Sequence, residues 1–219
     1  TVERVTILKD EQAKKFLGSY IPVNSLLDTK NPITMGAWSP PDYLFELKRE
    51  QEKAMARAKK VIVEVGQEYG QISGRYYDLI EGYRLEDADY VLVGIGSTMG
   101  TVHFVVDQLR EKGVKAGLLK VRSFRPFPSQ EISEALRGKE VVGVLDRALS
   151  LGAAGNPLYA DLSTSLFQRR ESLRVISYAY GIGGRDLLPN QINQAYQELI
   201  AEREREEFQS PFRYLGLKE

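Results

Sequence analysis

The 219-residue chain contains no cysteine and only one histidine, His103. Disulfides, iron–sulfur clusters and thiolate zinc sites all need cysteine side chains. Their absence excludes these three features from this polypeptide, and a single histidine excludes any site that needs two imidazoles. Avoidance of cysteine is also typical of proteins of the reducing cytoplasm, so we expect a cytoplasmic protein.

The sequence also lacks an excess of charge and a long hydrophobic run. Lys and Arg number 30, Asp and Glu number 30, and the formal net charge is zero. Binding to nucleic acid or to an anionic membrane needs a concentrated basic surface, so we expect neither as the main partner. No apolar run approaches the roughly 18 residues that span a bilayer, and we expect no signal peptide.

Residues 1–85 are predicted to form a linker arm followed by a long docking helix. Residues 1–38 show little periodicity, apart from a short helix expected over 10–16. Ser39-Pro40-Pro41-Asp42 is a typical helix start, and Gly66 and Gly70 are the expected ends. Apolar side chains then recur at steps of three and four residues and form one stripe, which burial would stabilise by roughly 10 kcal/mol at about 2 kcal/mol for each large side chain. The stripe comprises Leu44, Leu47, Gln51, Met55, Ala58, Ile62 and Val65.

Residues 86–207 alternate between short apolar segments and helical patterns. Strands are expected over 90–95, 114–121, 141–145 and 173–179, with helices between them and a closing helix over 190–207. Such alternation predicts an α/β domain with a doubly wound, mainly parallel sheet. The charged end of the closing helix, 202–207, is expected to be a solvated face with a Glu202–Arg205 pair. Residues 208–219 are predicted to be a C-terminal tail that packs on a neighbour.

A glycine turn, Gly94, Gly96 and Gly100, lies between the first of these strands and the following helix. Helix N-termini in this context can bind phosphate, so an NADP-binding oxidoreductase domain is the alternative function, with Arg122 or Arg125 on the extra phosphate. The spacing is one residue longer than the dinucleotide motif, and the acidic residue expected about 20 residues later is absent.

Four loops follow the predicted strands: 94–100, 122–128, 146–155 and 181–186. Their polar residues are candidates for a ligand site, because open α/β sheets bind ligands at the carboxyl ends of their strands. The contrasting interpretation is that the arginines pair with Asp146, Asp186 or a neighbouring subunit. His103 is expected to be a surface residue, because no aspartate partner is obvious in the sequence. No nucleophile and base come together in the pattern, so no catalytic, cofactor-binding or metal-binding residue is assigned. The loop candidates are Ser97, Thr98, Arg122, Arg125, Asp146, Arg147, Ser150, Arg185 and Asp186.

Four segments in succession resemble one known family. They read NPITMGAWSPPDY (31–43), VLVGIGSTMGT (91–101), LLKVRSFRPFP (118–128) and VLDRALSLGAAGNPL (144–158). Together they resemble the C-terminal portion of the α subunit in the pyruvate:ferredoxin oxidoreductases, within the 2-oxoacid:ferredoxin oxidoreductase family. The resemblance implies a domain similar to the transketolase C-terminal domain. Asn156 departs from it, since a glycine followed directly by proline is expected there.

The resemblance also implies a function. The family decarboxylates a 2-oxoacid on thiamine diphosphate with Mg²⁺, passes electrons through 4Fe–4S clusters to ferredoxin, and releases acyl-CoA from coenzyme A. This chain lacks the motif for the diphosphate and the cysteines for a cluster, so these cofactors are expected on other domains or subunits. The implied role is structural: assembly of the complex and its dimerisation. Pyruvate is the first expectation for the substrate, with oxalate or a branched 2-oxoacid behind it.

Overall fold

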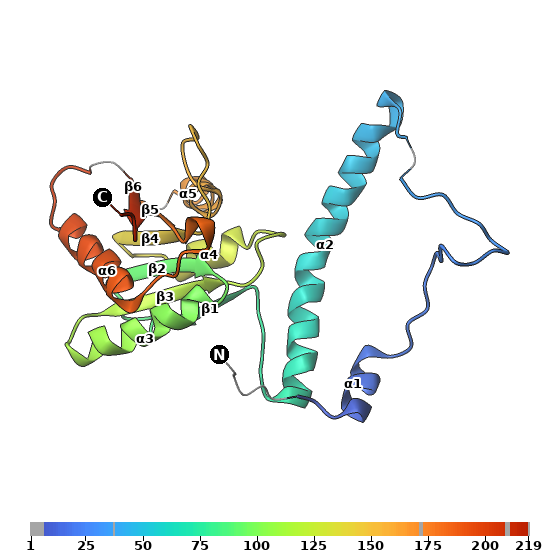
Figure 1. Cartoon of the computed structure of the whole chain (residues 1–219), viewed down its shortest axis with the longest axis horizontal. Coiled ribbons are helices and arrows are strands. Elements are labelled where there is room, and N and C mark those ends of the chain that lie inside the picture. Colours follow the sequence, from blue (N-terminus) through green and yellow to red (C-terminus); the bar gives the residue numbers. More distant parts are fainter. Residues whose placement is uncertain (1–6, 37, 171–172, 209–210, 219) are drawn as a thin grey trace. The chain divides into compact units, whose positions relative to one another are not determined.

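The computed structural model describes residues 7–36, 38–170, 173–208 and 211–218 (Figure 1). The chain divides into two compact units, Thr1–Tyr77 and Asp78–Glu219.

The first unit consists of two helices joined by an extended segment. Helix α1 spans Asp10–Leu17 and helix α2 spans Pro41–Ser73. Pro40 and Pro41 start α2 as predicted, since proline at the first helical position lacks only an N–H that would be unpaired there. Gly74 ends the helix in the left-handed conformation, with φ of 71°.

The prediction that Gly66 and Gly70 end this helix is wrong. Both glycines lie inside α2 and are buried. A Cβ on Gly66 would clash with the carbonyl oxygen of Tyr77, and one on Gly70 would clash with the ring of Tyr76. The two glycines therefore allow the chain after the helix to pack closely on its last turns, and this packing outweighs their low helix propensity of about 1 kcal/mol each.

The apolar stripe of α2 remains accessible in the first unit. Its five large side chains are between 37% and 46% exposed, namely Leu44, Leu47, Met55, Ile62 and Val65. Near the end of the helix, Phe16 of α1 packs edge-on against Tyr69, with ring centroids 5.8 Å apart. Docking of the stripe thus stays a prediction.

The second unit is built on a six-stranded sheet in the order β1-β3-β2-β4-β5-β6. Strand β1 runs antiparallel to β3, and the other neighbours are parallel. The predicted α/β class with a mainly parallel sheet is confirmed. The strands are β1 Ile80–Tyr83, β2 Tyr90–Ile95, β3 Ala116–Val121, β4 Val141–Asp146, β5 Arg174–Tyr180 and β6 Phe212–Leu215.

Helices cover both faces of this sheet (Figure 1). Helices α3 (Thr98–Glu111) and α6 (Pro189–Arg203) share one apolar cluster with the sheet. Helices α4 (Ser129–Ala135) and α5 (Pro157–Gln168) share a second cluster on the opposite face. A short 3-10 turn, η1 (Ile182–Gly184), follows β5. Double coverage explains why the central strands are nearly continuous apolar runs.

The sheet extends beyond the range 86–207 at both ends. Strand β1 precedes that range, and β6 comes from the segment expected to be a tail. In addition, α6 ends at Arg203 rather than at Glu207. Residues 203–207 are exposed, as expected of a solvated segment, and Glu202 alone departs from the expectation. Glu202 does pair with Arg205, at 3.0 Å, but its side chain is fully buried because Arg213 of β6 also reaches it, at 2.6 Å.

Candidate functional site

The connections of the sheet diverge between β2 and β4. Helix α3 leads from β2 to β3 on one side, whereas α5 leads from β4 to β5 on the other. In open α/β sheets, ligands bind outside the carboxyl ends of the strands at such a switch point, because the two loops there turn away from each other and leave a crevice. A pocket of about 350 Å³ lies at this place.

The pocket brings together part of the predicted candidate set. Ser97, Thr98, Asp146 and Arg147 all line it. Tyr180, at the end of β5, also lines it and was missed by the sequence analysis, although it directly precedes one of the four predicted loops. Its hydroxyl donates a hydrogen bond to Thr98 Oγ1 at 2.9 Å. Six other candidates are not among the lining residues: Arg122, Arg125, His103, Ser150, Arg185 and Asp186.

Asp146 is buried at the base of this loop cluster, with 5% of its surface exposed. Its two carboxylate oxygens accept hydrogen bonds from the backbone N–H groups of Leu158 and Tyr159, at 2.9 and 3.0 Å. Burial raises the pKa of Asp146, and these two hydrogen bonds oppose the increase. The Asp146 side chain therefore holds the first turn of α5, where the helix dipole stabilises a negative charge.

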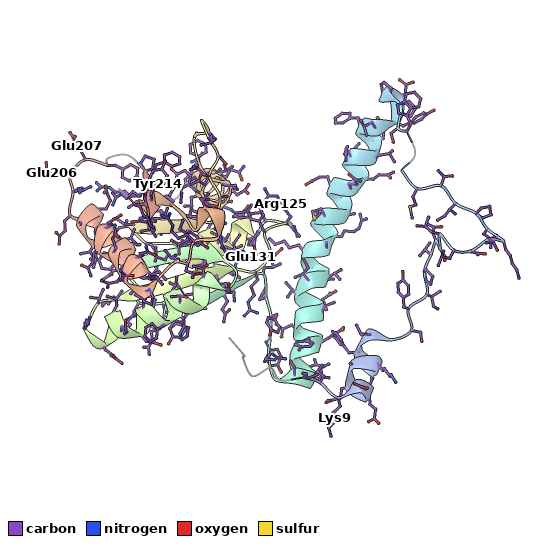
Figure 2. All side chains as sticks on the ribbon, in the orientation of Figure 1. Lys9, Arg125, Glu131, Glu206, Glu207 and Tyr214 are labelled. Carbon is purple, nitrogen blue, oxygen red and sulfur yellow. The ribbon has the colours of Figure 1, made fainter. Side chains whose placement is uncertain are left out.

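The arginines of the loop after β3 are engaged away from the pocket. Arg122 pairs with Glu81 of β1 at 2.6 Å, and Arg125 pairs with Asp161 of α5 at 2.8 Å. Arg125, labelled in Figure 2, also lies 4.2 Å from the centroid of the Phe124 ring. The expected partners, Asp146 and Asp186, are thus wrong for both arginines, and the carboxylates that replace them come from distant segments.

The first glycine of the turn, Gly94, is required by packing. The space that a Cβ of Gly94 would need is filled by Met99 Sδ, 2.6 Å away, and by Leu145. This glycine therefore serves packing inside the sheet unit rather than the approach of a ligand. Since Arg122 is also paired with Glu81, the geometry does not favour the NADP alternative.

His103 has an aspartate partner after all. Its Nδ1 lies 3.5 Å from an oxygen of Asp107, one turn further along α3, and its ring stacks on Tyr83 at 3.7 Å. Tyr83 donates to Asp107 at 2.6 Å, and this hydrogen bond is the main reason why the pKa of Asp107 is lowered. The i to i+4 spacing could have revealed the pair, whereas Tyr83 comes from a strand that the sequence analysis did not predict.

Comparison with known proteins decides the family. Residues 88–192 match the family described as "Pyruvate:ferredoxin oxidoreductase core domain II". The chain is 44% identical, over 100% of its length, to "Pyruvate synthase subunit PorA" of Thermotoga maritima, of which it covers 55%. The chain belongs to the 2-oxoacid:ferredoxin oxidoreductase family.

Two further similarities accompany this match. "Ketoisovalerate oxidoreductase subunit VorA" of Pyrococcus abyssi is 37% identical over 91% of this chain and 50% of the relative. A solved structure, a 2-oxoglutarate:ferredoxin oxidoreductase from Magnetococcus marinus with 2-oxoglutarate, coenzyme A and succinyl-CoA bound, aligns with 80% of this chain and 28% of that chain, at 18% identity and a TM-score of 0.48. The chain spans about half the length of the curated relatives named here.

The loop after β4 is held by Asn156, the residue at which the sequence departs from the expected glycine–proline pattern. The side chain is fully buried. Its Oδ1 accepts a hydrogen bond from the N–H of Ser150, and its Nδ2 donates to Ser177 Oγ on β5, both at 3.1 Å. Asn156 thus ties the loop after β4 to the neighbouring strand, a role that a glycine could not fill.

Within residues 7–36, 38–170, 173–208 and 211–218, no group of three or more histidine, aspartate or glutamate side chains is arranged to hold a metal ion. Across the same residues, no helix combines the length and the apolar character that crossing a membrane requires.

Proposed function

We propose that this chain is the C-terminal, structural part of the α subunit of a thiamine diphosphate-dependent 2-oxoacid:ferredoxin oxidoreductase. The whole enzyme would convert a 2-oxoacid, coenzyme A and oxidised ferredoxin to acyl-CoA, CO₂ and reduced ferredoxin. The observation that carries the proposal is the 44% identity to a pyruvate synthase subunit along the entire chain.

The donor set of the chain does not fit an iron–sulfur cluster. Cysteine is absent from the sequence, so no 4Fe–4S cluster can be ligated by this polypeptide. Across the described residues, no group of three or more carboxylate or imidazole side chains is arranged to hold a metal ion, and the sequence lacks the family's diphosphate motif. We therefore propose that thiamine diphosphate, Mg²⁺ and the clusters lie on other domains or subunits.

The role left to this chain is assembly with its partner subunits. The first unit carries large apolar side chains that are strongly exposed, for example Tyr20, Val23 and Trp38 at 90%, 96% and 84%. Together with the α2 stripe they exceed the scattered apolar residues of an ordinary surface. We propose the first unit, residues 1–77, as the docking arm and the second unit, residues 78–219, as the α/β domain that also includes the two edge strands, in a cytoplasmic complex that dimerises.

Pyruvate is the proposed substrate of the complex. The relative with the higher identity, 44%, is named a pyruvate synthase subunit, and the relative named for ketoisovalerate is 37% identical. A branched 2-oxoacid is therefore the second candidate. Comparing ferredoxin reduction by the assembled complex with pyruvate and with 2-ketoisovalerate separates the two.

Co-purification with the remaining subunits tests the structural role. The double variant Met55→Gln, Ile62→Gln removes two apolar anchors of the α2 stripe, and at about 2 kcal/mol each it should weaken assembly roughly a thousandfold. The matched control is Arg49→Gln, Lys53→Gln, on the opposite face of the same helix. The complex should form with the control and not with the stripe variant. Oxidation of a 2-oxoacid by this chain alone, or a redox cofactor retained by it, would refute the proposal.

A further inference from the structure

The proposed structural role does not account for the pocket at the switch point. It is open at the carboxyl ends of β2 and β4, and its volume of about 350 Å³ falls within the range of small-ligand sites, roughly 300–1,000 Å³. We propose that this pocket binds a small molecule through an oxyanion, either a phosphate ester or a carboxylate. The proposal concerns this chain's own residues and is independent of the assignment to an oxidoreductase complex.

A positively charged side chain, Arg147, lines the pocket. Among the described residues, Arg147 forms no ion pair; its Nε donates to the carbonyl oxygen of Gly181 at 3.2 Å. The remaining guanidinium N–H groups can therefore receive an oxyanion, for which the planar fork of arginine is well suited. Asp146, which precedes it and also lines the pocket, already accepts hydrogen bonds from the first turn of α5.

On the other wall of the pocket, the N-terminus of α3 has no acidic side chain to balance the positive end of its dipole. Ser97, at the N-cap of α3, makes no side-chain capping hydrogen bond. The first N–H groups of a helix have no acceptor one turn earlier in the helix. In α3, Met99 and Gly100 donate to the carbonyl oxygens of Gly96 and Ser97 at 3.4 and 2.9 Å. The Ser97 and Thr98 N–H groups and the helix dipole are therefore what favour a negative group there. Ser97 and Thr98 line the same pocket as Arg147.

The walls of the pocket combine buried apolar side chains with hydrogen-bonded polar groups. Leu145 and Leu158 belong to the buried core, with 2% and 1% of their surfaces exposed. The Tyr180 hydroxyl is fixed on Thr98 at 2.9 Å. An apolar floor with a few convergent polar groups is typical of small-molecule sites, because the polar groups orient a ligand whose remainder is buried.

The test is a titration of the whole chain with inorganic phosphate, and in parallel with acetate, followed by nitrogen-15 NMR at constant ionic strength. Saturable shifts of the Ser97 and Thr98 amides are expected at about millimolar anion. The anion that produces them identifies the preferred oxyanion. Saturation by neither anion would overturn the proposal.

Two variants and one control make the test specific. Arg147→Gln should weaken binding about tenfold, because it removes a charge-assisted hydrogen bond. Ser97→Asp should weaken it by a similar factor while the melting temperature is kept or raised, because a carboxylate then occupies the positive end of α3. Lys112→Gln, at the other end of α3 and about 20 Å away by helix length, should leave the affinity unchanged.

Each outcome with these variants decides the matter. Equal weakening by Lys112→Gln and Arg147→Gln would mean that the anion responds only to the net charge of the domain, and the pocket site would be wrong. Unchanged affinity in Ser97→Asp would also overturn it, since that variant is expected to fold at least as well as the original chain.

Discussion

Substituting Glu202 by glutamine should destabilise the α/β unit more than any other single change to a charged side chain. The Glu202 side chain is fully buried and lies 2.6 Å from Arg213 and 3.0 Å from Arg205. Arg174 lies farther away, at 3.9 Å. Glutamine keeps the volume and removes the charge, so three guanidinium groups lose their shared partner.

The magnitude follows from how exposed each partner is. Removing one member of a buried ion pair costs about 3–5 kcal/mol, because the remaining charge is left uncompensated. Arg213 is 18% exposed and takes most of this loss, whereas Arg205 is 43% exposed and is partly solvated already. We therefore expect a loss of about 3 kcal/mol, which at a slope of about 1.5–2 kcal/mol/M lowers the urea midpoint by about 1.5–2 M.

Urea unfolding followed by the near-ultraviolet circular dichroism of the buried tyrosines measures this loss. The control is Glu198→Gln, since Glu198 contacts the same Arg213 at 3.2 Å but is 26% exposed, and its loss should be clearly smaller. A double-mutant cycle with Arg213→Gln should give a coupling energy above about 1 kcal/mol. Hydrogen exchange should show the amides of β6 opening first. A loss below about 1 kcal/mol in Glu202→Gln would refute the reasoning.

Two further predictions concern the α/β unit. Asn156→Ala should cost about 1–3 kcal/mol, because the N–H of Ser150 loses its acceptor in a buried loop, and thermal unfolding that matches the original chain would contradict this role. Stability should also fall on acidification below about pH 4, because three carboxylates have a pKa that is lowered by their partners in the folded state. The stability that they contribute is present above the pKa of the unfolded state. It is lost as the pH falls through the pKa of the folded state. Burial of Asp146 acts in the opposite direction. Asp107→Asn should make the melting temperature depend less on pH between pH 6 and 3, and an unchanged pH dependence would count against this account. The three carboxylates are Asp87, Asp107 and Glu140.

The central sheet was predictable because each of its strands is a short apolar run followed by a helix with its own periodicity. The two edge strands were not. Strand β1 is antiparallel and four residues long, and β6 is equally short, so neither leaves a pattern that exceeds the noise of local composition. Their pairing depends on contacts between distant segments, such as Arg122 with Glu81, which local spacing does not encode.

The candidate site was predictable as a location and not as a set of partners. The rule that ligands bind at the carboxyl ends of parallel strands brought Ser97, Thr98, Asp146 and Arg147 together correctly. The same rule could not show that Arg125 turns away to Asp161. The burial of Glu202 was missed for a related reason. A charged helix end normally faces solvent, and the Glu202 side chain is buried here because Arg213 of the edge strand reaches it.

Stability and assembly draw on different residues of this chain. The α/β unit buries two apolar clusters, one on each face of its sheet, and so has a complete core of its own. The large apolar side chains of the first unit are by contrast mostly exposed, and most of the strongly exposed ones in the chain belong to it. Because hydrophobic free energy follows the apolar area removed from water, binding to a partner should be governed by the first unit. Substitutions in the sheet core should then alter unfolding, whereas substitutions in the α2 stripe should alter association while leaving the sheet unit intact.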